Sequence, residues 1–172
     1  MRRLLFLLLA PAACREHHDL APTASHPVAV YQAAVDSMVP QDPRALHGWL
    51  ADSTHPLAAT MGEHDDWFLG QAPSDYREAL RALLADTLPQ VPLPRSLELP
   101  HEIRWAAATD EADPLDTHFE LSKIGFNVDS SRAVLIRSYY CGALCAGIGI
   151  ELYERIGAAS WRRTGIIPVL AS

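Results

Sequence analysis

The chain has 172 residues and carries 14 Lys and Arg against 21 Asp and Glu, a net charge of −7, with 49% hydrophobic and 20% charged residues. This balance excludes a disordered or fibrous chain and predicts one globular domain with a sizeable core. The acidic excess argues against a nucleic-acid partner, because domains that bind nucleic acids carry a basic surface.

The first 14 residues have the layout of a secretory signal peptide. Arg2 and Arg3 form a positive start, residues 4–9 are an unbroken apolar run, and small residues precede Cys14. The run is shorter than the ~20 apolar residues that span a bilayer. Small residues followed by Cys resemble the bacterial lipobox, in which the Cys is lipidated. We therefore expect a signal peptide over 1–13 and a lipid on Cys14 that anchors the protein in the cell envelope, facing the periplasm.

Pro11 departs from the lipobox pattern, which prefers Leu at that position. Ordinary cleavage after Ala12, giving a secreted protein, therefore stays open as the alternative. The sequence has three cysteines, an odd number that asks for an explanation in an exported protein. With Cys14 lipidated, Cys141 and Cys145 remain as an even pair in an oxidising compartment.

The predicted tether and first helix follow the signal peptide. Residues 14–26 are polar and contain Pro and Ala, so they are expected to link the anchor to a single domain over 27–172. A helix begins near Pro27, with Ser25 or His26 as its cap, and ends before Pro40. Its apolar side chains recur at helical spacing at Tyr31, Ala34, Val35 and Met38.

A second helix is predicted over 74–88. Ser74 is a good N-cap, and Pro89 ends the helix. Between the two helices, residues 45–52 fit a strand or a helical turn equally well, and 53–73 are expected to form a loop that can include one short helical turn. The apolar stripe of the second helix consists of Tyr76, Leu80, Leu83, Leu84 and Leu88.

The second half of the chain has a residue pattern that predicts β-strands. Short links separate the segments, which predicts an antiparallel meander of about four to five strands. Helices first and strands second indicate an α+β fold, with the N-terminal helices packed on one face of the sheet. The expected strands are 103–107, 118–127 with an interruption near Gly125, 133–140, 146–155, and 161–170, in which Pro168 indicates an edge or a bulge.

Motifs for chemistry are scarce. The sequence contains no GxSxG, P-loop, GxGxxG or CxxC motif. His64 stands beside Asp65 and Asp66 and could serve as a catalytic base or a zinc ligand, although a polar loop explains the same residues. His101–Glu102 begins like HExxH, but Trp105 stands where the second His belongs.

Two further groups of residues invite a functional interpretation. Acidic residues between 110 and 116 supply oxygen atoms that suit Ca²⁺, but they lack the spacing of an EF-hand, so a solvated turn is the better interpretation. Tyr139–Tyr140 and Trp161 fit sheet packing better than a platform on which ligands stack.

Cys141 and Cys145 are predicted to form a structural disulfide. Three residues separate them, between two predicted strands. A redox role favours CxxC at a helix N-terminus, and a metal site needs two more ligands. A disulfide that closes the hairpin is therefore the better interpretation.

Residues 121–161 resemble the C-terminal part of a group of small bacterial exported proteins and lipoproteins without an assigned activity. The resemblance implies export and the cysteine hairpin, and it implies no chemistry. Ala146 departs from the group, which often has Gly directly after the second Cys. The residues that carry the resemblance are Leu121–Ser122, Gly125–Phe126–Asn127, Ala133, Tyr140–Cys141–Gly142, Leu144–Cys145, Gly147 and Trp161.

The sequence thus favours a bacterial envelope lipoprotein that acts as a non-catalytic binding or interaction module. Its expected partners are the membrane, through the lipid on Cys14, and a protein or ligand that the sequence does not identify. No catalytic residue, cofactor or metal site is assigned. The alternative is an envelope hydrolase or metal-dependent enzyme that uses the His64/Asp65/Asp66 or the His101/Glu102 region.

Overall fold

The structure is a computed structural model, and it describes residues 25–39, 48–56, 64–86, 88–106, 116–141 and 145–171. The expected signal peptide, Cys14 and most of the expected tether lie outside these residues. Within them, no helix is both long and apolar enough to cross a membrane. The helices are α1 (Ser25–Val35), α2 (Asp65–Gln71) and α3 (Arg77–Leu84), and a 3₁₀ turn, Ser74–Tyr76, precedes α3.

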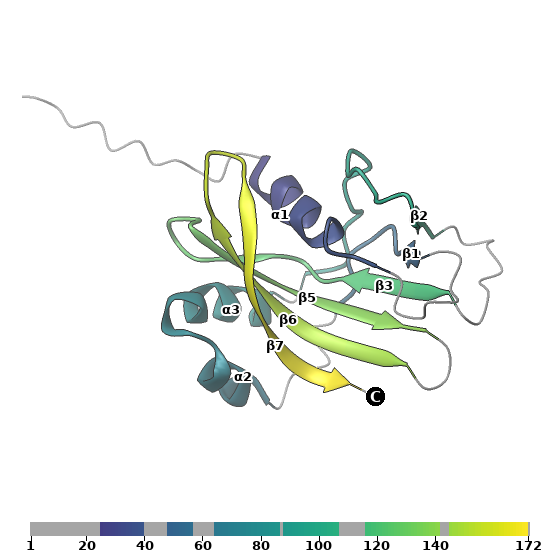
Figure 1. Cartoon of the computed structure of the whole chain (residues 1–172). Coiled ribbons are helices and arrows are strands. Elements are labelled where there is room, and N and C mark those ends of the chain that lie inside the picture. Colours follow the sequence, from purple (N-terminus) through teal and green to yellow (C-terminus); the bar gives the residue numbers. More distant parts are fainter. Residues whose placement is uncertain are drawn as a thin grey trace, which may run out of the picture.

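The strands form one mixed sheet in the order β2-β1-β3-β5-β6-β7, with β4 paired to β5 (Figure 1). The fold class is α+β, as predicted. The strands are β1 (Gly48–Leu50), β2 (Ile103–Trp105), β3 (Thr117–Leu121), β4 (Gly125–Phe126), β5 (Arg132–Tyr140), β6 (Ala146–Arg155) and β7 (Trp161–Ala171).

The predicted count of four to five strands and the purely antiparallel meander are wrong. Within the described residues the sheet has seven strands, and β1 lies between β2 and β3 and runs parallel to both. Both neighbours come more than 50 residues later in the chain. A three-residue strand that pairs with such distant segments leaves too short a pattern to be recognised in the sequence.

The helices cover both faces of the sheet, so the prediction that they share one face is also wrong. Because side chains alternate along a strand, Ala133 and Leu135 of β5 pack with α1 in one core, whereas Val134 and Ile136 pack with α3 in the other. The second core confirms the predicted contact between the stripe of α3 and the strands. The buried residues of this contact are Leu80, Leu83, Val134, Ile136, Ile150 and Leu152, and Leu84 is partly buried at the edge of the core.

The helix α1 begins two residues before the expected start of the domain. His26, which the sequence placed in the tether, is therefore buried, and its ring contacts Trp161 edge-on at 6.2 Å between centroids. The Tyr31 hydroxyl donates to the carbonyl of Ser122 at 3.2 Å and fastens the helix to the link after β3. Burial raises the pKa of this hydroxyl well above its ordinary value.

The helix predicted over 74–88 is shorter than expected. Ser74 is not an N-cap but the first residue of the 3₁₀ turn, Tyr76 holds the N-cap position of α3, and α3 ends at Leu84. The Asp86 carboxylate accepts the backbone N–H of Leu88 at 2.9 Å, a local bond that competes with continuation of the helix. Leu88 is consequently exposed rather than part of the stripe.

The predicted interruption near Gly125 is confirmed, because β3 ends at Leu121 and β4 begins at Gly125. In the gap, the Ser122 hydroxyl accepts the backbone N–H of Ile136 at 2.8 Å. A Cβ on Gly125 would lie 2.1 Å from the carbonyl oxygen of Ala79, so only glycine lets α3 approach this closely.

The cysteine hairpin forms as the spacing predicts. Tyr140 and Ala146 are the last paired residues of β5 and β6. Beyond them, the N–H of Cys141 donates to the carbonyl of Cys145 at 2.7 Å, and a disulfide joins the two residues across a Cα separation of 5.0 Å.

Candidate functional site

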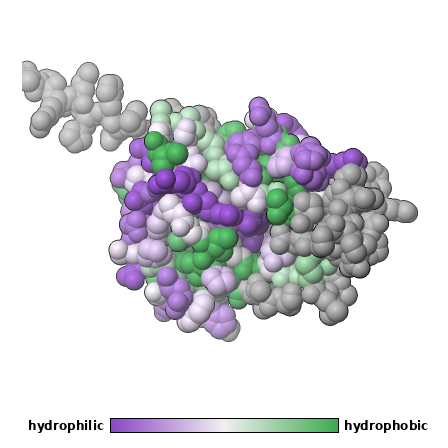
Figure 2. Space-filling view, in the orientation of Figure 1, coloured by the Kyte–Doolittle hydropathy of each residue, from purple (hydrophilic) through white to green (hydrophobic). Residues whose placement is uncertain are grey.

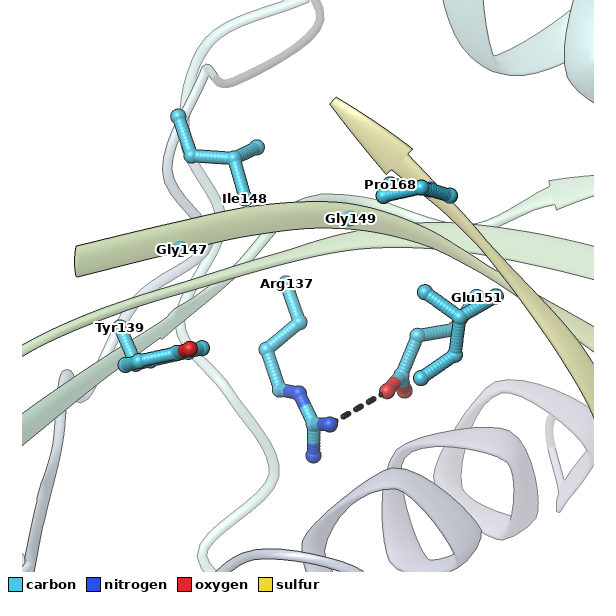
Figure 3. A pocket seen from close by; sticks show the side chains of 8 residues that line it. Arg137, Tyr139, Gly147, Ile148, Gly149, Glu151 and Pro168 are labelled. Carbon is cyan, nitrogen blue, oxygen red and sulfur yellow. Dashed lines mark ion pairs between the residues drawn. The ribbon is translucent and has the colours of Figure 1, made fainter. Parts of the chain in front are cut away.

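A pocket of about 200 Å³ lies across β5, β6 and β7 (Figure 3). Figure 3 shows Tyr139, Arg137 and Glu151 pointing to one side of the strands and Ile148 to the other. The side that holds the first three is the one that α1 covers, since Tyr139 packs against the core around that helix. The lining residues are Arg137, Tyr139, Gly147, Ile148, Gly149, Glu151, Ile166 and Pro168.

The hollow exists because two successive residues of β6 on this face are glycines. Gly147 pairs with Tyr139 and Gly149 pairs with Arg137, so larger side chains of β5 flank an empty stretch of β6. A Cβ on Gly147 would lie 2.6 Å from the Tyr139 ring. On Gly149 it would lie 2.8 Å from the Cγ2 methyl of Ile166. Side chains at either position would narrow the pocket.

Glu151 closes one end of the pocket as a buried carboxylate that is only 1% exposed. Its Oε1 atom accepts from Arg137 Nη2 at 2.7 Å and from Arg163 Nη1 at 2.9 Å, and its Oε2 atom accepts from the Tyr153 hydroxyl. A buried carboxylate is tolerated when cations and hydrogen bonds satisfy it in this way. Two guanidinium groups against one carboxylate leave one net positive charge at the site.

Tyr153 serves the cluster as a hydrogen-bond donor. Burial, followed by the nearby charge of Glu151, raises the pKa of the Tyr153 hydroxyl far above its ordinary value. The phenol therefore stays protonated at physiological pH and donates to the carboxylate.

Ser37 joins the cluster to the end of α1. Its hydroxyl oxygen accepts from Arg137 Nη1 at 3.0 Å and from Arg163 Nη1 at 3.1 Å, and its proton goes to the carbonyl of Ala34 at 2.8 Å. Two guanidinium groups beside the C-terminus of a helix are also favoured by the helix dipole. The guanidinium groups of Arg137 on β5 and Arg163 on β7 therefore share two partners, Glu151 on β6 and Ser37 just after α1.

Sequence reasoning missed this pocket, although a pattern was present. The strand β6 reads Gly-Ile-Gly-Ile-Glu from Gly147 to Glu151, and Arg137 interrupts the apolar run of β5. A charge inside an apolar strand indicates a partner on a neighbouring strand. Recognising that Arg137 on β5 is the partner of Glu151 on β6 requires the register between the two strands.

The first group of predicted candidates lies at the start of α2. His64 and Asp66 are exposed, and Asp65 is half-buried. Asp65 lines a second hollow between α2 and α3, which it shares with Leu69, Arg81, Leu84 and Ala85.

The second group lies directly before β2. His101 is 90% exposed and pairs with Glu102 at 3.0 Å. Figure 1 shows α2 and β2 on opposite sides of the molecule, so the structure does not bring this pair together with His64. Among the described residues, no three His, Cys, Asp or Glu side chains are placed to share a metal ion.

Of the acidic residues between 110 and 116, Asp116 lies within the described part of the chain. It is buried, and its Oδ2 atom accepts from the indole nitrogen of Trp49 at 2.6 Å. Asp110, Glu111 and Asp113 lie outside the described residues.

A smaller polar group lies on the opposite face of the sheet from the pocket. The His118 ring stacks on Tyr140 with 4.7 Å between centroids, and Glu120 accepts from the Ser138 hydroxyl at 3.0 Å. Glu120 also lies 3.9 Å from Nδ1 of His55. Burial lowers the pKa of His118, and the negative charges of Asp116 and Glu120 partly offset this effect.

The pocket between β5, β6 and β7 combines a hollow, a net positive charge and a buried carboxylate, so its residues carry the functional inference for this protein. No protein-family model, curated protein or solved structure matches the chain.

Proposed function

We propose that the protein is a bacterial envelope lipoprotein that binds a small ligand in the pocket between β5, β6 and β7 and performs no catalysis there. The observation that carries this proposal is the buried Glu151 with its two arginines beside an unfilled hollow. Building such a cluster costs desolvation energy, and apolar residues of similar volume would often stabilise a fold as well or better. Its presence beside a cavity therefore favours a role in binding.

Binding is preferred to hydrolysis for a reason of placement. His64 lies at the start of α2, whereas His101 and Glu102 precede β2 at the far edge of the sheet. His101 has Glu102 within hydrogen-bond reach, but a general base must also reach the reacting atom, and neither His101 nor His64 is among the described residues that line the pocket.

The location of the protein is proposed from its N-terminal residues and its cysteines. The positive start, the short apolar run and the small residues before Cys14 support export and lipidation. The Cys141–Cys145 disulfide agrees with an oxidising compartment such as the periplasm. The membrane is then a partner through the lipid alone, because the acidic protein is repelled by an anionic membrane surface.

Mass spectrometry of the mature N-terminus, on protein isolated from its native envelope, tests the location. We expect a mature chain that begins at Cys14 and carries acyl groups. A free and unacylated N-terminus at Ala13 would contradict lipidation and leave the secreted alternative.

The binding role is tested by filling the pocket. Ile166 lines the pocket and is 47% exposed, so Ile166→Trp adds bulk there with little disturbance of either core. Ile156, which is 57% exposed in the β6–β7 turn, gives the matched control Ile156→Trp. We expect small molecules from an envelope extract to be retained, in native mass spectrometry, by the natural protein and the control but not by Ile166→Trp. Equal retention by all three proteins would contradict a ligand site in this pocket.

A further inference from the structure

We propose that the group the pocket recognises is a singly charged carboxylate attached to a small apolar body. This inference rests on the proposed function, because it names the chemical class of ligand for the same pocket. A free carboxylic acid and the C-terminal carboxylate of a short peptide share this chemistry, and the experiment below separates them.

Arg137 supplies the donors. Its side chain is 15% exposed and lines the pocket, so its guanidinium group is largely shielded from water. A guanidinium has five N–H donors, and the contacts of Arg137 within the described residues use two, one to Glu151 and one to Ser37. Three donors remain, one each on Nε, Nη1 and Nη2, and donors on neighbouring guanidinium nitrogens match the two oxygen atoms of a carboxylate.

The charge balance favours a monoanion. The two arginines and Glu151 sum to one positive charge, which a carboxylate neutralises. A phosphate dianion would leave a net negative charge beside the buried Glu151, and a cationic ligand would add to the excess of positive charge. Because half-buried charges are costly when unbalanced, the carboxylate is the better fit.

The shape of the pocket sets the size and polarity of the rest of the ligand. The volume of about 200 Å³ is below the ~300–1,000 Å³ of pockets that hold drug-sized molecules. Its walls are the Tyr139 ring, Ile166 and Pro168 over a floor of two glycines. Figure 2 shows apolar surface over the middle of β7, the strand that supplies Ile166 and Pro168. A branched or short aliphatic body therefore fits better than a sugar.

The experiment compares matched probes by calorimetric titration of the full mature protein. Isovalerate tests the free acid, isovaleramide removes the charge, and isoamylamine reverses it. The dipeptide Ala-Leu and its C-terminal amide test the peptide source. We expect one carboxylate probe to bind at least about tenfold more tightly than its amide, and isoamylamine not to bind. If only isovalerate binds, the ligand is a free acid, whereas preferential binding of Ala-Leu identifies a peptide carboxylate.

Two variants assign the binding to Arg137. Arg137→Gln is expected to remove the preference for the acid over the amide, whereas Arg104→Gln, on the exposed side of β2, leaves it unchanged. Because Arg137→Gln takes one cation from a buried carboxylate and could unfold the protein, Ile166→Trp provides a second test that keeps every charge. Loss of isovalerate or dipeptide binding in this variant, with its folding intact, places the binding in the pocket that Arg137 lines.

The failures of the two proposals differ. Equal binding of acid and amide, stronger binding of the amine, or no binding of any carboxylate up to about 10 mM overturns the carboxylate assignment. If neutral or cationic molecules then bind in a manner sensitive to Ile166→Trp, the pocket is still a ligand site. Carboxylate binding that Ile166→Trp leaves unchanged overturns both proposals.

Discussion

The ammonium group of Lys123 lies 2.8 Å from the Asp86 carboxylate and fastens the end of α3 to the link between β3 and β4. The same ammonium donates to the carbonyl of Leu88 at 2.6 Å. Lys123 is the single lysine of the sequence. This contact joins the helix on one face of the sheet to the strand break at Ser122–Ile124.

The Asp86–Lys123 pair predicts a loss of stability in acid. The hydrogen bond from Lys123, followed by that from the backbone of Leu88, holds the pKa of Asp86 below its ordinary value of 3.8. A carboxyl group with a lower pKa in the folded state stabilises the protein above its unfolded pKa, and this contribution is lost as the pH falls through the folded pKa.

Asp86→Asn should therefore lower the free energy of unfolding at pH 7 and have little effect near pH 2. Because both partners are partly exposed, we expect a difference of less than about 1 kcal/mol. Urea denaturation at several pH values measures it. Equal destabilisation by Asp86→Asn at both pH values would show that the charge of Asp86 plays no part.

Gly125→Ala should destabilise the protein. The added Cβ meets the carbonyl oxygen of Ala79 and the backbone nitrogen of Leu83, which belong to the rigid frame of α3. We expect a loss of roughly 1–3 kcal/mol or more, measured by denaturant unfolding. Gly70→Ala is the matched control, because none of the described atoms lies within 4 Å of its Cβ position and a helical Ala is favoured over Gly by about 0.5–1 kcal/mol. A similar response to both substitutions would contradict the close approach of α3.

Leu80→Ala should cost roughly 2–5 kcal/mol, because Leu80 is fully buried between α3 and the strands. Leu84→Ala should cost less, since Leu84 is only partly buried at the edge of the same core. Arg81→Ala, on the exposed side of the helix, serves as the control. Unfolding midpoints of Leu80→Ala and Arg81→Ala that cannot be distinguished would show that the stripe is not buried.

The sequence predicts the long strands well and the short ones poorly. β5, β6 and β7 match their predicted ranges to within one residue at each end, because alternating β-branched and aromatic residues with short links give a local pattern. β1 is three residues long, and its partners, β2 and β3, lie far along the chain. The position of β1 in the sheet, and therefore its parallel pairing with β2 and β3, depends on contacts between distant segments that a local sequence pattern does not reveal.

The candidate site escaped prediction for a related reason. Arg137, Glu151 and Arg163 are 14 and 12 residues apart, and they meet only because three strands pair in a particular register. The register between β6 and β7 also contains irregularities between Leu152 and Tyr153 and between Ile148 and Gly149. Alternation alone therefore cannot place Arg163 beside Glu151, whereas the cluster His64–Asp66 is visible in the sequence because its residues are adjacent.

Glu151→Gln should destabilise the protein strongly. The substitution leaves the guanidinium groups of Arg137 and Arg163 without their shared carboxylate in a largely buried cluster. Breaking a buried ion pair typically costs roughly 3–5 kcal/mol. Glu154→Gln on the same strand, which faces the more exposed Arg162, should cost less than about 1 kcal/mol. Chemical denaturation of both variants measures the contrast, and equal costs would mean that the Glu151 cluster contributes nothing beyond a surface pair.

Removal of the Cys141–Cys145 disulfide should have a modest effect. The bond closes a loop of about five residues, for which the chain-entropy estimate is roughly 2 kcal/mol, at the low end of the usual range. The paired strands on either side continue through Arg132–Tyr140 and Ala146–Arg155, so the ladder persists without the bond. The double substitution of both cysteines by serine should therefore lower the melting temperature by several degrees and leave the far-ultraviolet circular dichroism nearly unchanged.

The natural protein treated with a reducing agent should behave like the double variant, which separates loss of the bond from the effect of the new side chains. Loss of the β-sheet spectrum on reduction would contradict a local role, and two free thiols in unfolded protein taken from the periplasm would contradict the disulfide itself.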